Sequence, residues 1–130
     1  MASRKLTDLS QAMQRLAMEF ESRCRAESLD IVIICTWRSN DEQAKAFACG
    51  ASNCRPGESA HNALDNMLRP AAEAFDVGVI RNGKYIGDGR DMDYLRAGQI
   101  GEALGLAWAG RWKGKIKEVA HFQNPAWRKP

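Results

Sequence analysis

The chain contains only two histidines, and each lies beside features that a metal site requires. His61 follows the turn-forming stretch CGASNCRPG, and His121 lies in the apolar run VAHF. Between them, Asp76 interrupts the strand-like segment AEAFDVGVI. Two imidazoles and one carboxylate form a three-ligand zinc set that leaves a fourth position to water, as catalytic zinc sites do.

Asp76 has a second interpretation, because a polar residue in a strand commonly points to solvent on the outer face of the pleat. If Asp76 points inward instead, its charge is too costly to bury unpaired, and a cation is its natural partner. The residue types alone leave both interpretations open.

Glu118 precedes His121 by three residues and is a candidate general base. A hydrolytic zinc site needs a base within hydrogen-bond reach of the attacking water. In a regular strand the two side chains would point to opposite faces, so this use of Glu118 requires a turn or bulge before His121. The alternative is a solvated glutamate at the end of the charged run KGKIKE.

The N-terminal part of the chain predicts a helix, a strand and a second helix. Apolar residues recur at helical spacing from Thr7 to about Ala26. The run DIVIICTW is apolar on both faces of an extended chain and therefore predicts a strand that is buried on both faces. Ser39 and Glu42 form a capping box that starts a short helix at about Asn40. Arg38 therefore lies at a strand-to-helix junction.

The remaining elements complete an α+β pattern. Asn82-Gly83 predicts a hairpin between AEAFDVGVI and KYIG. Residues 91–104 predict a helix that Gly105 terminates, and residues 119–123 predict a short strand. We therefore expect a single compact domain, residues 1–130, with a small antiparallel sheet flanked by helices.

Composition narrows the class of protein. The 130 residues suit one domain, and a formal charge of +3 is too small to indicate a nucleic-acid binder. The first residues contain no apolar core of a secretion signal, and no stretch is apolar enough to span a membrane. We expect a protein made in the cytoplasm, with no stable membrane insertion and with its four cysteines reduced. Cys49 and Cys54 are too few for a metal site, but a disulfide after release from the cell remains open.

Several short blocks, in their order along the chain, resemble the zinc peptidoglycan peptidases. This family includes the D-alanyl-D-alanine carboxypeptidases and the phage L-alanyl-D-glutamate endolysins, with the pattern S-x-H, A-x-D, GL-W-G-W and D/E-x-x-H-F. The matching blocks here are SAH from Ser59, AFDV from Ala74, GLAWAGRW from Gly105, EVAHF from Glu118 and, upstream, TWRS with Glu42 and Gln43. Ordered blocks of this kind are more specific than any one of them.

The resemblance implies a role for each matching residue. It makes His61, Asp76 and His121 the ligands of a Zn²⁺ ion in a cleft on the sheet, and Glu118 the catalytic base. It implies that Arg38 binds or polarises the substrate, which suits the planar donor fork of a guanidinium. Further substrate-binding candidates are Ser59, Gln43 and Trp108; Ser59 could equally be a turn hydroxyl, and Trp108, like Trp112 and Trp127, could equally pack in the core.

The sequence departs from the family in the spacing of its first two ligands. His61 and Asp76 are fifteen residues apart, whereas fewer than ten usually separate them in the family, so Asp65 competes as a ligand. We favour Asp76 because PAAEAFDV matches the family strand, and a strand fixes a ligand more rigidly than a loop does. Residues 63–69 then form an inserted loop, which we expect at the rim of the cleft. Ala109, where the family commonly has glycine, affects only local backbone shape.

The resemblance implies a bacterial wall peptidase that hydrolyses the peptidoglycan stem peptide. With no secretion signal, a phage or prophage endolysin with L-alanyl-D-glutamate endopeptidase activity is favoured over a D-alanyl-D-alanine carboxypeptidase. Such a monomer would be released to the periplasm and wall at lysis with the help of a separate membrane-permeabilising protein. A non-catalytic wall-binding module is a further alternative, against which the retained Glu118 argues, and a nucleic-acid binder would rest only on the basic run RWKGKIK.

Overall fold

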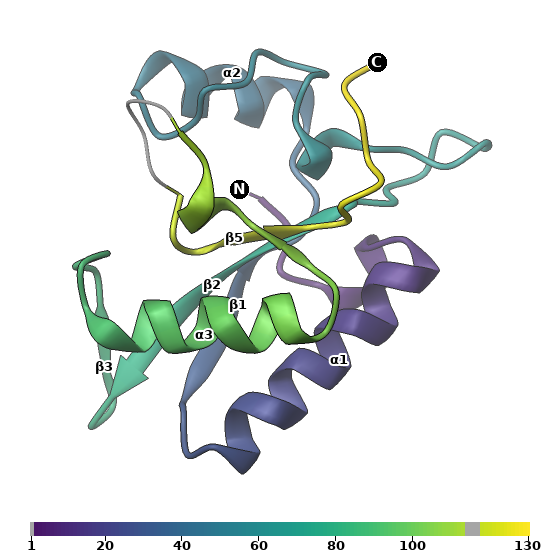
Figure 1. Ribbon diagram of the computed structural model, residues 1–130. Coiled ribbons are helices and arrows are strands. Elements are labelled where there is room, and N and C mark those ends of the chain that lie inside the picture. Colours follow the sequence, from purple (N-terminus) through teal and green to yellow (C-terminus); the bar gives the residue numbers. More distant parts are fainter. Residues whose placement is uncertain (1, 114–117) are drawn as a thin grey trace.

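The structure, a computed structural model, describes residues 2–113 and 118–130 (Figure 1). Positions 114–117 of the basic run RWKGKIK therefore lie outside the described residues. The helices are α1 (Gln11–Ala26), α2 (Asn40–Ala48) and α3 (Met92–Ala103), with short 3₁₀ turns at Leu6–Asp8, Ala60–Asn62 and Ala109–Arg111. The strands are β1 (Ile31–Cys35), β2 (Ala74–Arg81), β3 (Lys84–Ile86), β4 (Ala107–Trp108) and β5 (His121–Gln123).

All the strands pair antiparallel in one sheet whose order is β1-β2-β5-β4, with β3 also paired to β2. The longest strand, β2, is central, because it bonds to β1 along one edge and to β3 and β5 at other positions. A site built on β2 can therefore draw residues from the strands along both of its edges.

One face of the sheet carries the hydrophobic core. Phe75 and Val77 of β2 pack with Phe122 of β5 and with residues of α1 and α3, including Phe20 and Ile100. Figure 1 shows α1 and α3 on this side of the sheet and α2 on the opposite side. Since successive side chains in a strand alternate between faces, Asp76 lies on the face away from this core.

The first helix begins later than the sequence pattern predicts. Residues Leu6–Asp8 form a 3₁₀ turn, and α1 starts at Gln11, where the Ser10 side chain accepts a hydrogen bond from the Met13 amide. Ser10 is a favoured N-cap residue, whereas the apolar periodicity runs through the turn without marking the break. The helical pattern is therefore right from Gln11 and wrong before it.

Strand β1 is not buried on both faces, contrary to the prediction. Ile33 and Cys35 are buried, whereas Val32 is 38% exposed. The physical reason is position: β1 lies at the edge of the sheet order, so one of its faces is only partly covered. A continuous apolar run does not distinguish an edge strand from a central one.

The strand predicted over residues 119–123 is shorter than expected, because residues 119 and 120 form a turn and β5 begins at His121. The remaining element predictions are confirmed. Ser39 and Glu42 form the capping box of α2, and the hairpin turns at Asn82 and Gly83. Gly105, with φ of +92°, follows α3 in the left-handed conformation that glycine adopts without strain.

An ion-pair network fastens the hairpin to α3. Arg81 of β2 donates hydrogen bonds to Asp91 at 2.7 and 3.0 Å and to Asp93 at 2.7 Å. These three residues are called the Arg81 cluster below. Hydrogen bonds from Arg81 hold the pKa of both carboxyls below the ordinary aspartate value.

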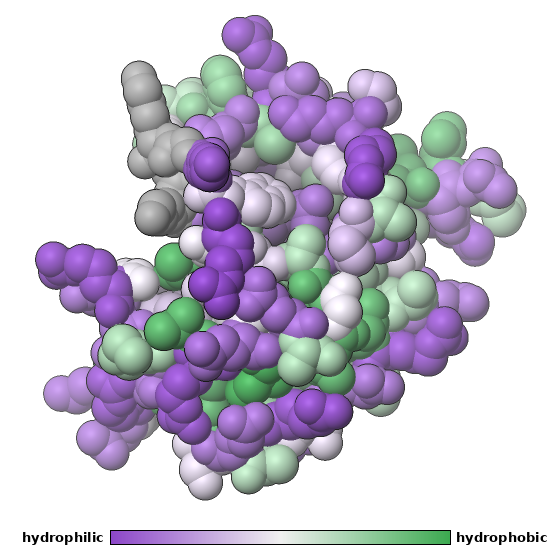
Figure 2. Space-filling model, viewed as in Figure 1, coloured by the Kyte–Doolittle hydropathy of each residue, from purple (hydrophilic) through white to green (hydrophobic). Residues whose placement is uncertain are grey.

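The inserted loop, residues 63–69, projects away from the rest of the chain at the right of Figure 1, and Figure 2 shows hydrophobic side chains there. Leu64, Met67 and Leu68 are 47, 71 and 78% exposed. The main pocket described below has none of these residues in its wall, and only Ala63 and Leu64 reach a smaller neighbouring pocket. The loop therefore lies farther from the site than expected, and not at the rim of the main pocket.

The expected fold class is confirmed: a small α+β domain with an antiparallel sheet between helices. None of the described helices has the length and apolar character to cross a membrane.

Candidate active site

Asp76 is placed by the register of β2. Its direct partners across the sheet are His121 on β5 and Cys35 on β1. Residues opposite one another on antiparallel strands bring their side chains together on one face. Asp76 is only 18% exposed, so its charge requires partners, and the inward interpretation of this residue is correct.

His61 reaches the same point from the 3₁₀ turn Ala60–Asn62. The Ser59 side chain caps this turn by accepting a hydrogen bond from the His61 amide at 3.1 Å. The ring is almost fully buried, and its Nδ1 lies 2.7 Å from the carbonyl oxygen of Thr36. Because a carbonyl oxygen can only accept, Nδ1 carries the hydrogen and Nε2 of the neutral ring is a free acceptor.

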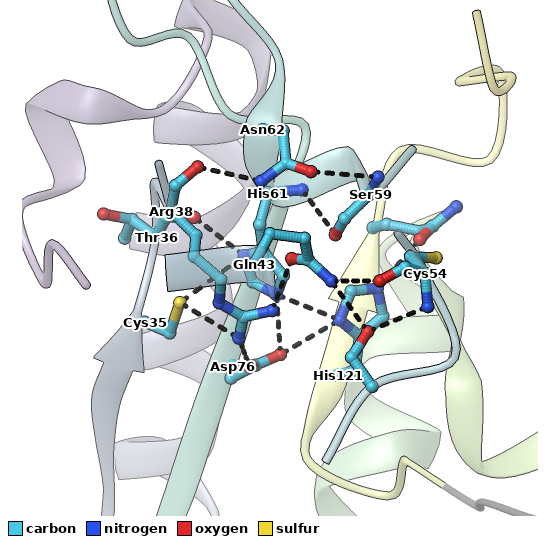
Figure 3. Close-up of polar contacts among 12 residues, drawn as sticks. Cys35, Thr36, Arg38, Gln43, Cys54, Ser59, His61, Asn62, Asp76 and His121 are labelled. Carbon is cyan, nitrogen blue, oxygen red and sulfur yellow. Dashed lines mark hydrogen bonds and ion pairs between the residues drawn. The ribbon is translucent and has the colours of Figure 1, made fainter. Parts of the chain in front are cut away.

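His121 is oriented in the same way by its neighbour on β5. Its Nε2 lies 2.8 Å from the side-chain oxygen of Gln123, which accepts the Nε2 hydrogen. Nδ1 of the neutral ring is therefore the free acceptor, and it points toward Asp76 and His61 (Figure 3). Hydrogen bonds that fix the distal nitrogen of an imidazole are typical of metal-ligating histidines.

When both rings are neutral, three acceptor atoms consequently converge. The distances are 3.1 Å between His61 Nε2 and Asp76 Oδ1, 3.1 Å between the two histidine nitrogens, and 3.0 Å between His121 Nδ1 and Asp76 Oδ1. Lone pairs facing one another at such distances need a proton or a metal ion among them. Ligand atoms about 2.0–2.1 Å from a tetrahedral zinc ion lie about 3.3 Å apart, so the donor set fits a metal of this size.

Without a metal ion, a proton on His61 can occupy the place between these acceptors. Burial lowers the pKa of His61, but the charge of Asp76 and its hydrogen bond outweigh burial and raise the pKa to about 10. Burial raises the pKa of Asp76, yet the facing histidines hold it well below the ordinary range. Asp76 is therefore ionised and stabilises a positive charge that faces its oxygens, and a metal ion bound by these residues would replace the proton of His61.

Cys35 is a neighbour that the sequence did not single out. Its Sγ lies 3.7 Å from His61 Nδ1, and Cys35, His61 and Asp76 could together hold a metal, with their ligand atoms within 4.8 Å of one another. The thiol faces the nitrogen that donates to Thr36, whereas His121 faces the free acceptor. The more compact set is therefore His61, Asp76 and His121.

Arg38 contacts the second oxygen of Asp76. Its Nη2 lies 3.6 Å from Asp76 Oδ2, and its Nη1 donates to the side-chain oxygen of Gln43 at 2.9 Å. Gln43 is fully buried and also donates to Ser52 and to the Cys54 carbonyl. Gln43 therefore orients Arg38, which corrects the expectation that Gln43 contacts the substrate directly.

A pocket of about 700 Å³ opens above the cluster. His61, His121, Arg38 and Glu118 all line it. The Glu118 carbonyl accepts a hydrogen bond from the His121 amide at 3.0 Å, which closes a turn at residues 118–121. This is the turn that the spacing of Glu118 and His121 requires.

Trp108 does not line this pocket. It is 6% exposed within the hydrophobic core, and its indole N–H donates to the Val119 carbonyl at 2.8 Å. A side chain so enclosed offers no surface to a substrate, which corrects that expectation. Trp112 and Trp127 line the pocket instead, and Ser59 lines it while capping the His61 turn.

Two further alternatives are resolved by position. Asp65 accepts hydrogen bonds from the Met67 and Arg69 amides and from the Arg69 side chain, all within its own exposed loop. It is therefore not part of the cluster around His61. Cys49 and Cys54 are both free thiols, so no disulfide joins them in this structure.

The comparisons with known proteins agree with the geometry. No family model matches the chain. The peptidoglycan L-alanyl-D-glutamate endopeptidase CwlK of Bacillus subtilis is 27% identical over 128 residues, which cover 90% of this chain and 74% of that protein. The crystal structure of the L-Ala D-Glu endopeptidase ChiX of Serratia marcescens superposes with a TM-score of 0.70 at 18% identity, covering 95% of this chain and 88% of that one, and so shares the fold. The resemblance of this chain to the peptidoglycan peptidases is thus confirmed.

Proposed function

We propose that the protein is a zinc-dependent hydrolase of the peptidoglycan stem peptide with L-alanyl-D-glutamate endopeptidase activity. The observation that carries this proposal is the convergence of three acceptor atoms, from His61, Asp76 and His121, beside a pocket that His61, His121 and Glu118 line. The similarity to CwlK and the fold shared with ChiX support the choice of substrate.

The donor set suits zinc among the common metals. Two imidazole nitrogens and one carboxylate oxygen match the mixed ligands of catalytic zinc sites, whereas magnesium and calcium prefer oxygen alone. Zinc bound by His61, Asp76 and His121 would lower the pKa of a water molecule and polarise a carbonyl group. Arg38 holds Oδ2 of Asp76, which leaves Oδ1 directed at the histidines.

The protein groups around the floor of the pocket then complete the reaction. Glu118 takes the proton of the attacking water and passes it to the leaving amine, which needs a carboxylate with access to the pocket. The Arg38 guanidinium, oriented by Gln43, donates to the substrate carbonyl or carboxylate with the N–H groups that its protein partners do not occupy.

Two alternatives use the same site. A D-alanyl-D-alanine carboxypeptidase would release a terminal D-alanine, and a non-catalytic wall-binding module would bind the wall without turnover. Both relatives reported above are named as endopeptidases, which supports the first assignment. A module without turnover has no use for Glu118 in the pocket wall.

We further propose a bacteriolytic role, as the lysis enzyme of a phage or prophage. The motifs shared with phage endolysins suggest a monomer that is made in the cytoplasm and reaches the wall when a separate membrane-permeabilising protein opens the way. Expression of the chain with and without such a protein tests this role. We expect lysis only when both proteins are expressed together. Absence of lysis in both cultures would contradict this role.

The test of activity is digestion of purified peptidoglycan followed by mass spectrometry of the new termini. A new free amine on D-glutamate is expected, whereas released D-alanine would establish the carboxypeptidase. The matched control is Glu118→Gln, which should keep one zinc per chain and lose about 10²–10⁴-fold in rate. Digestion of the wall at an unchanged rate by Glu118→Gln would remove Glu118 from the mechanism.

A further inference from the structure

The charges in the wall of the main pocket are unbalanced. Among the described residues that line it, four side chains are cationic, whereas Glu118 is the only acidic residue. The cations are Arg38, Lys113, Arg128 and Lys129. A cleft lined by one sign of charge concentrates ligands of the opposite sign, so this pocket favours an anionic peptide.

Two of these cations come from the C-terminal segment, residues 124–130, which leaves β5 and runs past the site toward the loop that follows α2 (Figure 1). Trp127, Arg128 and Lys129 line the main pocket, and Trp127 and Arg128 also line the smaller pocket beside it. The segment thus forms a wall shared by the two pockets.

This wall is anchored to the sheet. The backbone amide of Asn124 donates to the Glu73 carbonyl at 2.9 Å, and its side-chain amide donates to the Glu73 carboxylate at 2.7 Å. The Asn124 carbonyl and side-chain oxygen then accept hydrogen bonds from the amides of Trp127 and Ala126. Because Glu73 directly precedes β2, the turn holding Trp127 is fixed to the strand that carries Asp76.

The cationic groups of this wall have no acidic partner among the described residues. Arg128 donates Nη1 to the carbonyls of Pro125 and Trp127, which positions the guanidinium without neutralising it. No described residue forms an ion pair or hydrogen bond with the Lys129 ammonium. By contrast, Arg111, on the neighbouring 3₁₀ turn, is paired with Glu102.

The chemistry of an L-alanyl-D-glutamate bond supplies a matching anion. A glutamate acylated on its nitrogen keeps two carboxyl groups, and the peptide continues through only one of them. The other remains as a free carboxylate close to the scissile nitrogen, on the leaving-group side. Charge-assisted hydrogen bonds from a guanidinium or ammonium to a carboxylate are stronger than those between neutral groups.

We infer that Trp127, Arg128 and Lys129 form a subsite for the free carboxylate of the acidic residue on the leaving-group side of the scissile bond. The inference rests on the proposed function and adds a specificity to it. The enzyme distinguishes a stem peptide with a free glutamate carboxylate from one in which that carboxylate is amidated. Arg128 and Lys129 supply the charge, and Trp127 supplies the apolar surface beside it.

The test compares two synthetic peptides that differ only in this group, one with the free carboxylate and one with the primary amide. The double variant Arg128→Gln/Lys129→Gln is measured against the unsubstituted protein and against Lys84→Gln, which removes an exposed cation of β3 that lies outside both pockets. We expect the unsubstituted protein and Lys84→Gln to prefer the carboxylate peptide in kcat/KM. The double variant should lose about 5- to 25-fold on that peptide alone, chiefly through KM, because each exposed charge contact contributes up to about fivefold.

Equilibrium binding gives a readout independent of turnover. In the Glu118→Gln background, the affinity for the carboxylate peptide should fall as salt is raised, and this dependence should weaken when Arg128 and Lys129 are also replaced. An equal loss on both peptides would show that the segment acts only through shape and would overturn the subsite, while the proposed function would stand. Failure of the unsubstituted protein to cleave or bind either peptide would overturn both.

Discussion

Replacing Asp76 with asparagine should show whether the metal ligand is Asp76 or Asp65, which lies in the inserted loop. Asparagine keeps the size of the side chain but removes the charge, and Asp65→Asn makes the same change where the carboxylate bonds only within its own loop. Structural zinc is held by about 10–16 kcal/mol over four ligands, which is about 2.5–4 kcal/mol for each. Asp76→Asn should therefore weaken zinc binding by about 10²–10³-fold, and Asp65→Asn should leave it within about twofold.

The measurement is a zinc titration against a chromophoric chelator, with thermal unfolding of the metal-free proteins as the control for folding. Two further variants choose between the possible donor sets. His121→Ala should lose zinc as Asp76→Asn does, and Cys35→Ala should retain it, because the thiol faces the nitrogen of His61 that is bonded to Thr36. Loss of zinc in Asp65→Asn or Cys35→Ala, with retention in Asp76→Asn or His121→Ala, would refute the reasoning from converging acceptors.

Three further predictions concern the support of the site and of the fold. Gln123→Leu should weaken zinc binding by about 10–100-fold without abolishing it, measured by the same titration, because Gln123 fixes the His121 ring. Gly98→Ala should destabilise the fold by about 1–3 kcal/mol in chemical unfolding, because an added Cβ would lie 2.4 Å from the Trp108 ring; unchanged stability would contradict this packing. The depressed carboxyl pKa values of the Arg81 cluster mean that its stabilisation is present at neutral pH and is lost as pH falls below about 4, so Arg81→Ala should flatten the acid side of a stability profile.

Much of the fold followed from local patterns in the sequence. The capping box at Ser39, the Asn82-Gly83 turn and the glycine after α3 are signals that depend on a few neighbouring residues, and the structure confirms each. The failures at β1 and at Trp108 have a different origin. Whether a strand lies at an edge, and whether an aromatic ring faces a core or a pocket, depends on elements that are distant in sequence.

The candidate site shows the same division. The residue types of His61, Asp76 and His121, together with the ordered motifs, were enough to predict these three residues as metal ligands. The positioning residues were not predictable in that way, because their roles depend on three-dimensional contacts. Cys35 gave no signal beyond its place in an apolar strand, and Gln43 was assigned to the substrate because its burial could not be read from the sequence.

The register of β2 links the fold to the chemistry. Asp76 faces His121 on one side and Cys35 on the other, while its neighbours Phe75 and Val77 face the helices. Because the side-chain period of a strand is two residues, a slip of one residue in β2 would turn Asp76 into the core and Phe75 toward the pocket. The aromatic packing of Phe75 with Phe20 and Phe122 therefore opposes the slip that would dismantle the site. The apolar face of β2 thus fixes the position of the carboxylate on its polar face. The aspartate that interrupts the apolar run is held beside the two histidines by the packing of its apolar neighbours.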